Sequence, residues 1–172
     1  GGNGGIADTS ARASSAMGGT VSVEARESGG AGGRAFNGAR GGNGADSFMN
    51  DQVFGSTAGV LSLTQVARAG SGGLAWGFGI AGKGGNSESH LHVLDSEASK
   101  LYGQVGADGG AGGDVGNRVS HDGGKGGDAV ASMILIGADE VVGNASAYAG
   151  DGGNSSGATN GGDGGIARLG DV

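Results

Sequence analysis

The sequence contains no cysteine and no proline. A chain without cysteine forms neither disulfide bonds nor thiolate metal sites, so cysteine usage says nothing about its redox compartment. The lack of proline excludes collagen, whose triple helix needs abundant proline together with a strict Gly-X-Y period. The glycines of this chain therefore do not belong to a collagen triple helix.

Long apolar runs and clusters of basic residues are missing as well. No apolar stretch approaches the roughly 18 residues of a transmembrane helix, so we predict no membrane span. The net charge is −7, and the 10 lysines and arginines are scattered singly, which argues against a nucleic-acid partner. Leu, Ile, Val and Phe are so scarce that a flexible, disordered linker is the first alternative to consider.

Glycine is abundant instead, with 46 of 172 residues, and it recurs with a period. Short boxes such as GGNGG and GGAGG fall into two interleaved sets. The first set begins at residues 1, 41, 82, 123 and 161, and the second at residues 29, 70, 109 and 150. A period in this range is typical of stacked supersecondary units and argues against a random linker. We therefore predict one repeat array over 1–172, with repeats 1–40, 41–81, 82–122 and 123–160 and the start of a fifth at 161–172.

The stretches between the boxes alternate in polarity. In TVSVEARES, Val21, Val23 and Ala25 fall on one face and polar residues on the other, which is typical of a half-buried strand. Similar stretches follow in each repeat, in pairs around a turn, so we predict β-hairpins, with Gly18 and Gly19 as one hairpin turn. The stretch MILI at 133–136 is apolar on both faces and is therefore expected to be buried on both sides, with another chain as one candidate cover.

The boxes have a period of their own. In GGxGG the glycines align at a spacing of three, which matches the three residues per turn of polyproline II. Two of three faces would then be bare, and neighbouring backbones could approach closely. The middle residue of each box would project alone; these residues include Asn3, Ala31, Asn43, Lys125 and Asp163. The predicted fold is an all-β, solenoid-like array of hairpins with interleaved glycine-rich, polyproline II-like segments, about 40 residues per repeat.

Calcium is the first chemistry to weigh. GGNGADSFM at 41–49 and GGKGGDAVA at 123–131 fit the calcium-binding nonapeptide GGxGxDxUx, with Asp46 and Asp128 at the aspartate position. GGAGGDVGN at 109–117, with Asp114, fits less well. Sites of that kind lie between consecutive nonapeptide turns, whereas these copies stand about forty residues apart. We therefore predict no cofactor and keep calcium as an alternative.

Other candidate side chains are few. His90 and His92 share the polar face of one predicted strand, but two ligands are too few for a metal site, and His121 is the only other histidine. Trp76 and Phe78 alternate with glycine, as a sugar-stacking platform or a cover for glycine backbone would. No nucleophile elbow, phosphate loop or recognisable carboxylate pair is present, so we predict no catalytic, cofactor-binding or metal residues and no enzyme.

GGxGG boxes together with alternating strands such as ASAYA resemble glycine-rich repeat proteins of bacterial surfaces, biofilm matrices and extracellular fibres. That resemblance implies a location outside the cell or on its surface. The matching first and last boxes, GGNGGIA and GGDGGIA, favour head-to-tail addition of copies. The predicted function is therefore a structural subunit or repeat segment of an extracellular self-assembling filament.

The main alternative is an adhesin-like module that binds a receptor or glycan through loops around Phe36, Trp76 and Tyr102. An ice-binding protein and a calcium-dependent segment of the nonapeptide type are two further alternatives.

Overall fold

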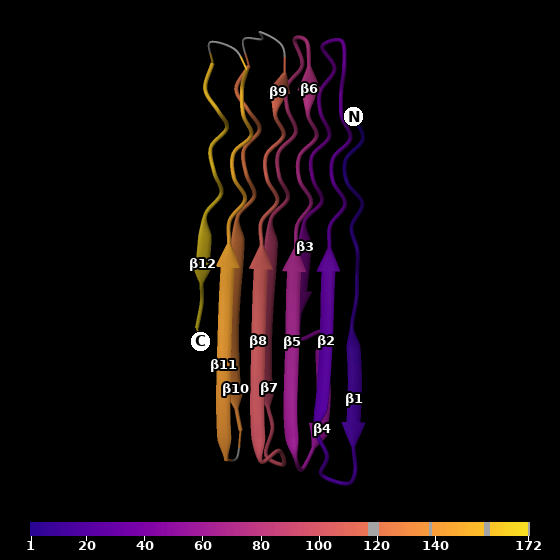
Figure 1. The fold of residues 1–172 in the computed structure, drawn as a ribbon, viewed down its shortest axis with the longest axis vertical. Helices are drawn as coiled ribbons and strands as arrows, with labels where there is room; N and C mark the ends of the chain where they lie inside the picture. Colours follow the sequence, from indigo (N-terminus) through magenta and orange to yellow (C-terminus); the bar gives the residue numbers. More distant parts are fainter. Residues whose placement is uncertain (117–120, 138, 157–158, 172) are drawn as a thin grey trace.

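The computed structural model describes residues 1–116, 121–137, 139–156 and 159–171, and this part of the chain is all-β, with no helix. Figure 1 shows an elongated slab in which long strands run along the long axis and thin zigzag segments continue them. The strands are β1 (Ala11–Ser15), β2 (Val21–Ser28), β3 (Ser47–Asn50), β4 (Val53–Thr57), β5 (Val60–Arg68), β6 (Ala75–Trp76), β7 (Ser87–Leu94), β8 (Lys100–Asp108), β9 (Val115–Gly116), β10 (Ala129–Ile136), β11 (Glu140–Tyr148) and β12 (Ala167–Leu169).

Two parallel sheets, which face each other, make up most of the slab. One has the strand order β12-β10-β7-β3, the descending layer, and the other has the order β11-β8-β5-β2, the ascending layer. Along one row of the ascending layer, Val21 pairs with Leu61, Leu61 with Leu101, and Leu101 with Val141, an offset of 40 residues each time. The prediction of a solenoid-like β-array with about 40 residues per repeat is thus confirmed.

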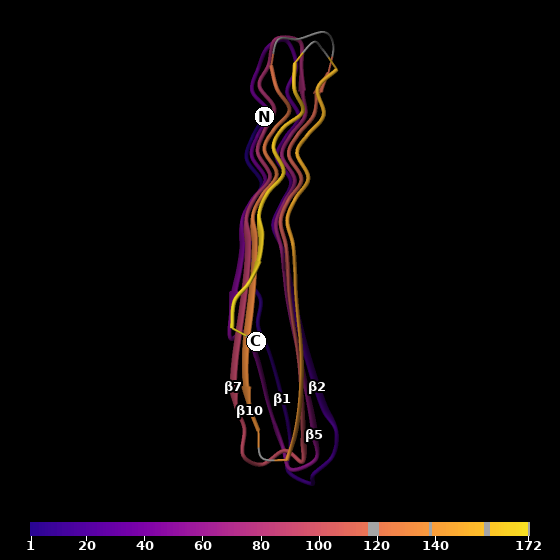
Figure 2. The same cartoon turned by 90° about the vertical axis from the view of Figure 1, so that its left-hand side faces the viewer.

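The pairing of strands differs from a hairpin. The two strands of a repeat, such as β7 and β8, lie in different layers and face each other across the core, and each pairs in parallel with its equivalent one coil away. Figure 2 shows the two layers edge-on, joined by arches at one end. Hairpins and arches share the same alternation and the same turn residues, so the local pattern predicts the strands but leaves their partners open.

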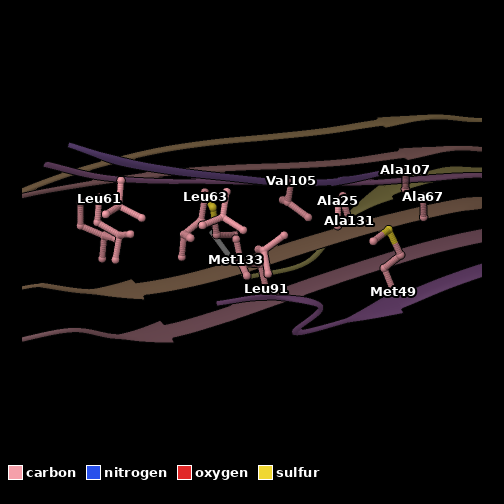
Figure 3. Packing of buried hydrophobic residues seen from close by; sticks show 14 of the residues in the cluster. Ala25, Met49, Leu61, Leu63, Ala67, Leu91, Val105, Ala107, Ala131 and Met133 are labelled. Carbon is pink, nitrogen blue, oxygen red and sulfur yellow. The ribbon is translucent and has the colours of Figure 1, made fainter. Parts of the chain in front are cut away.

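Inward-facing side chains become smaller along the strands. In β5 the inward residues run from Leu61 and Leu63 near the arches to Ala67 near the glycine segments, all of them buried. Figure 3 shows Leu61 at one end of this cluster and Ala67 and Ala107 at the other, where Met49 of β3 also lies. The two layers accordingly lie farther apart near the arches than beside the glycine boxes (Figure 2). This taper lets a β-sandwich merge into a bundle of bare backbones.

The glycine boxes form that bundle, and in it the backbone bonds in two directions. Gly32 N donates to Ser71 O within the ascending layer at 2.8 Å, whereas Gly30 N and Gly33 N donate across to the descending layer at 2.8 and 2.7 Å. The direction across the layers thus recurs every third residue, as in polyproline II. A Cβ on Gly110 would lie 1.9 Å from Gly70 O of the neighbouring coil in the same layer, and a Cβ on Gly84 would lie 1.9 Å from Gly110 O across the layers, so the boxes need their glycines.

The middle residue of each box is exposed, as predicted. Two of these residues, Asn3 and Asn43, also accept hydrogen bonds through their side chains. Asn3 Oδ1 accepts from Asn43 N at 2.9 Å, and Asn43 Oδ1 accepts from Lys83 N at 3.0 Å. These amides therefore bond one coil to the next.

One strand of the descending layer is broken. At Asp51, where φ is +49°, the chain leaves the partnership of β3 with β7, and β4 pairs with β1 instead. The buried Gln65 of β5 fills the break: its Oε1 accepts from Gln52 N at 2.7 Å, and its Nε2 donates to Met49 O at 3.3 Å, Ser89 Oγ at 3.1 Å and His90 O at 3.0 Å. Gln65 thus bonds backbone groups that the break takes out of the ladder.

Candidate functional site

Carboxylates and amides form a ladder on the outside of the descending layer, just where each box passes into a strand. Asp46 Oδ1 accepts from Asn86 N at 2.7 Å, Asn86 Oδ1 from Asp128 N at 2.9 Å, and Asp128 Oδ1 from Ile166 N at 2.9 Å. We call Asp46, Asn86 and Asp128 the acceptor ladder. The hydrogen bond from Ile166 lowers the pKa of the Asp128 carboxyl below its ordinary value of 3.8, and Lys125 at 3.4 Å adds to the effect.

The aspartates of the calcium motifs belong to such contacts. Asp46 and Asp128 lie on the same ladder, but the coil of Asn86 separates them. Asp114 lies in the other layer, where its Oδ1 accepts from Asn154 N at 2.7 Å. Within the described ranges, no three His, Cys, Asp or Glu side chains gather closely enough to hold a metal ion. The structure therefore gives these aspartates a role in joining coils and does not bring them together.

The two neighbouring histidines, His90 and His92, have different hydrogen-bond partners. His90 Nδ1 is 2.6 Å from Ser132 Oγ of the neighbouring strand, and its Nε2 is 3.6 Å from Glu88. His92 is exposed, and its backbone N donates to Asp51 Oδ1 at 2.6 Å. The carbonyl of His121 accepts from Thr159 Oγ1 at 2.9 Å in the loops at the far end of the slab. Each histidine is placed among hydrogen-bond partners of its own coil or the next.

The structure brings two of the three predicted aromatic loop residues together. Phe36 and Trp76 belong to neighbouring coils at the loop end of the ascending layer, where β6 and β9 lie (Figure 1). Phe78 lies in the loop after β6 and is 80 % exposed. Tyr102 lies elsewhere, half-buried in β8. The loop end thus carries Phe36, Trp76 and Phe78, whereas Tyr102 lies among the long strands.

The apolar stretch at 133–136 is buried on one side only. Met133 points into the core, but Ile134 and Ile136 lie on the outer face and are 45 % and 51 % exposed. Within the described part of this one chain, the outer face of β10 is uncovered, so burial on both sides would need another chain and stays a prediction.

The last ascending strand, β11, keeps part of its inner face open. Val141 is 40 % exposed, although its ladder partner Leu101 is buried, and Ala145 and Ala147 are half-buried. The facing strand β12 is short, so it covers only part of β11. On the opposite side of the stack, β2 likewise has a strand partner on one edge alone.

Gln65 is the structural residue that the sequence pattern missed. It stands on the apolar face of its strand, in line with the leucines, and a single polar residue in such a row was the available signal.

No family model, no curated protein and no solved structure matches this chain. The resemblance to glycine-rich extracellular repeat proteins therefore stays a prediction. In the described part of the chain, no helix is long and apolar enough to cross a membrane.

Proposed function

We propose that this chain is a structural subunit or repeat segment of an extracellular filament that assembles from copies of itself. The observation that carries the proposal is the parallel pairing of strands: in the described part of the chain, each coil bonds to the coils beside it through contacts that recur from coil to coil. Contacts of that kind join separate copies as readily as they join coils of one chain.

The edges of the stack support such addition. β11 is nine residues long, and beyond its first residue it contains neither lysine, glutamate nor proline, the residues that usually protect a sheet edge. Its free edge offers unpaired backbone groups, and its inner face offers Val141, Ala145 and Ala147 for burial. The acidic net charge keeps such an assembly soluble.

Electron microscopy and size-exclusion chromatography over a protein concentration series test the proposal, with and without calcium. We expect assemblies that grow with concentration and have a regular axial repeat. A protein that remains a single monodisperse species at every concentration would contradict it.

A matched pair of variants on β11 places the contact. Val141→Lys puts an ammonium group on the inner face, where a joining coil would bury it, and should raise the concentration needed for assembly by roughly tenfold or more. Val142→Lys puts the same group on the outer face of the same strand, where the side chain is 45 % exposed, and should assemble like the wild type. If both variants assemble equally, the contact between copies does not lie at the inner face of β11, and the proposal that copies join there is contradicted.

A further inference from the structure

At the loop end, one short row of side chains crosses four coils of the ascending layer. The buried residues Ala35, Ala75 and Val115 align with Ser155 through parallel bridges. The residues that follow them in the sequence lie in line on the outer surface. This row, which we call the tip shelf, consists of Phe36, Trp76, Gly116 and Ser156.

Gly116 lets the indole of Trp76 lie flat on the shelf. A Cβ on Gly116 would lie 2.9 Å from Cε3, 3.0 Å from Cζ3 and 3.1 Å from Cδ2 of Trp76, so the six-membered ring covers the glycine backbone. Trp76 as a whole residue is still 37 % exposed. Its inner face is therefore supported by Gly116, and Phe36, which is 59 % exposed, stands in the same row on the coil at the other side of Trp76.

Polar groups flank this aromatic surface. Two residues before each member of the shelf, on the same side of the extended chain, stand Arg34, Leu74, Asp114 and Asn154. The contact between Asp114 and Asn154 N ties the last two coils of this row together. The row offers guanidinium and amide donors and carboxylate and amide acceptors.

We propose that the tip shelf binds a carbohydrate, a β-linked pyranoside with one apolar C–H face, such as glucose, galactose or N-acetylglucosamine. Such a ring has an apolar face of C–H groups, and the negative face of an aromatic ring attracts them. Its hydroxyl edge both donates and accepts hydrogen bonds, which suits a flanking row that carries both kinds of group.

The chemistry favours this ligand over the other candidates. A nucleic-acid base also stacks on aromatic rings, but its phosphates are repelled by a protein with a net charge of −7. A stable protein partner buries about 800 Å² on each side, far more than two aromatic side chains present. A sugar ring matches the shelf in size.

Trp76 is the only tryptophan of the chain, so its fluorescence reports on the shelf directly. The test titrates cellohexaose, chitohexaose and a β-galacto-oligosaccharide into the purified protein, with an α-mannan oligomer as the comparison sugar. We expect a saturable change in emission for at least one β-linked sugar and none for the mannan.

Three variants tie the signal to the shelf. Phe36→Ala removes one stacking ring without touching the backbone and should weaken binding roughly tenfold. Gly116→Val should lift the indole from its seat and weaken binding at least as much. Phe78→Ala is the matched control, because it removes an exposed ring from the same loop end outside the shelf, and it should bind like the wild type.

The proposal is overturned if no β-linked sugar changes the emission, or if Phe36→Ala leaves the affinity for the sugar intact. An emission change that depends on protein concentration alone would make the shelf a contact between copies and would also overturn it. Because Phe36→Ala leaves the backbone alone, the test holds even if Gly116→Val fails to fold. Filament formation is measured separately and can fail without affecting this result.

Discussion

At the scale of single residues, the missing Cβ of glycine is what allows the two layers of the bundle to touch. The spacing of three within each box predicts this, and the close approach of Gly84 in the descending layer to Gly110 O in the ascending layer bears it out. The spacing could not predict which coils approach, because that depends on how the layers interleave: Gly110 N donates to Gly85 O, and Gly127 N donates to Gly110 O.

Gly110→Ala should therefore destabilise the fold by about 3 kcal/mol or more, because the atom in its way is backbone and cannot rotate aside. The matched control is Gly2→Ala, since a Cβ on Gly2 meets nothing within 4 Å. Urea unfolding of both variants gives the comparison. Equal midpoints would mean that the boxes do not pack as the structure has them.

At the scale of elements, alternation along the chain predicted the strands well. In β2 the buried and exposed residues alternate without exception over eight residues, as TVSVEARES indicates. The same reasoning missed the break between β3 and β4 at Asp51. A break that depends on a glutamine fourteen residues later, in the opposite layer, has no local signature.

The acceptor ladder makes the junction between box and strand sensitive to acid. The folded chain lowers the pKa of the Asp128 carboxyl below 3.8, so its charge stabilises the fold above that pH. Protonation favours the unfolded chain, and this contribution is lost as the pH falls below about 4 and through the folded pKa.

Asp128→Asn should weaken this acid sensitivity, because an amide oxygen still accepts from Ile166 N, as Asn86 does for Asp128 one coil earlier. The difference in melting temperature between pH 6 and pH 3 should be smaller in the variant than in the wild type. Asp163→Asn, at the exposed middle of a box, serves as the control and should leave that difference unchanged. An unchanged difference in Asp128→Asn would show that other groups dominate the acid response.

At the scale of the whole molecule, the period of the glycine boxes predicted the stacked coils. It could not predict that repeats pair in parallel, because the same period fits hairpins laid side by side. The sequence also could not predict the open inner face of β11. That face is open because the strand opposite, β12, is short, and in the sequence β12 looks like the start of any other strand.

A stack of this kind should survive the loss of a whole coil but not of half a coil. Deleting residues 125–162 joins Gly124 to Asp163, removes β10 and β11, and leaves β12 in position to pair with β7. We expect a folded, β-rich protein of lower stability, since each coil contacts only its neighbours. Deleting residues 125–143 instead joins a descending box directly to an ascending strand, and this protein should not fold. Circular dichroism and urea unfolding distinguish the two deletion variants. If both fold, or if neither folds, the stack is not built from coils that can be removed one at a time.

The two termini lie on opposite edges of the stack (Figure 1), whereas the loops and the arches lie at the two ends of its long axis. A pull on the termini therefore acts across the strands and peels off one coil at a time, breaking few hydrogen bonds at each step. A pull between loops and arches acts along the strands and loads the hydrogen bonds of neighbouring strands together, in shear. The molecule is thus mechanically anisotropic, weak across its coils and strong along its strands.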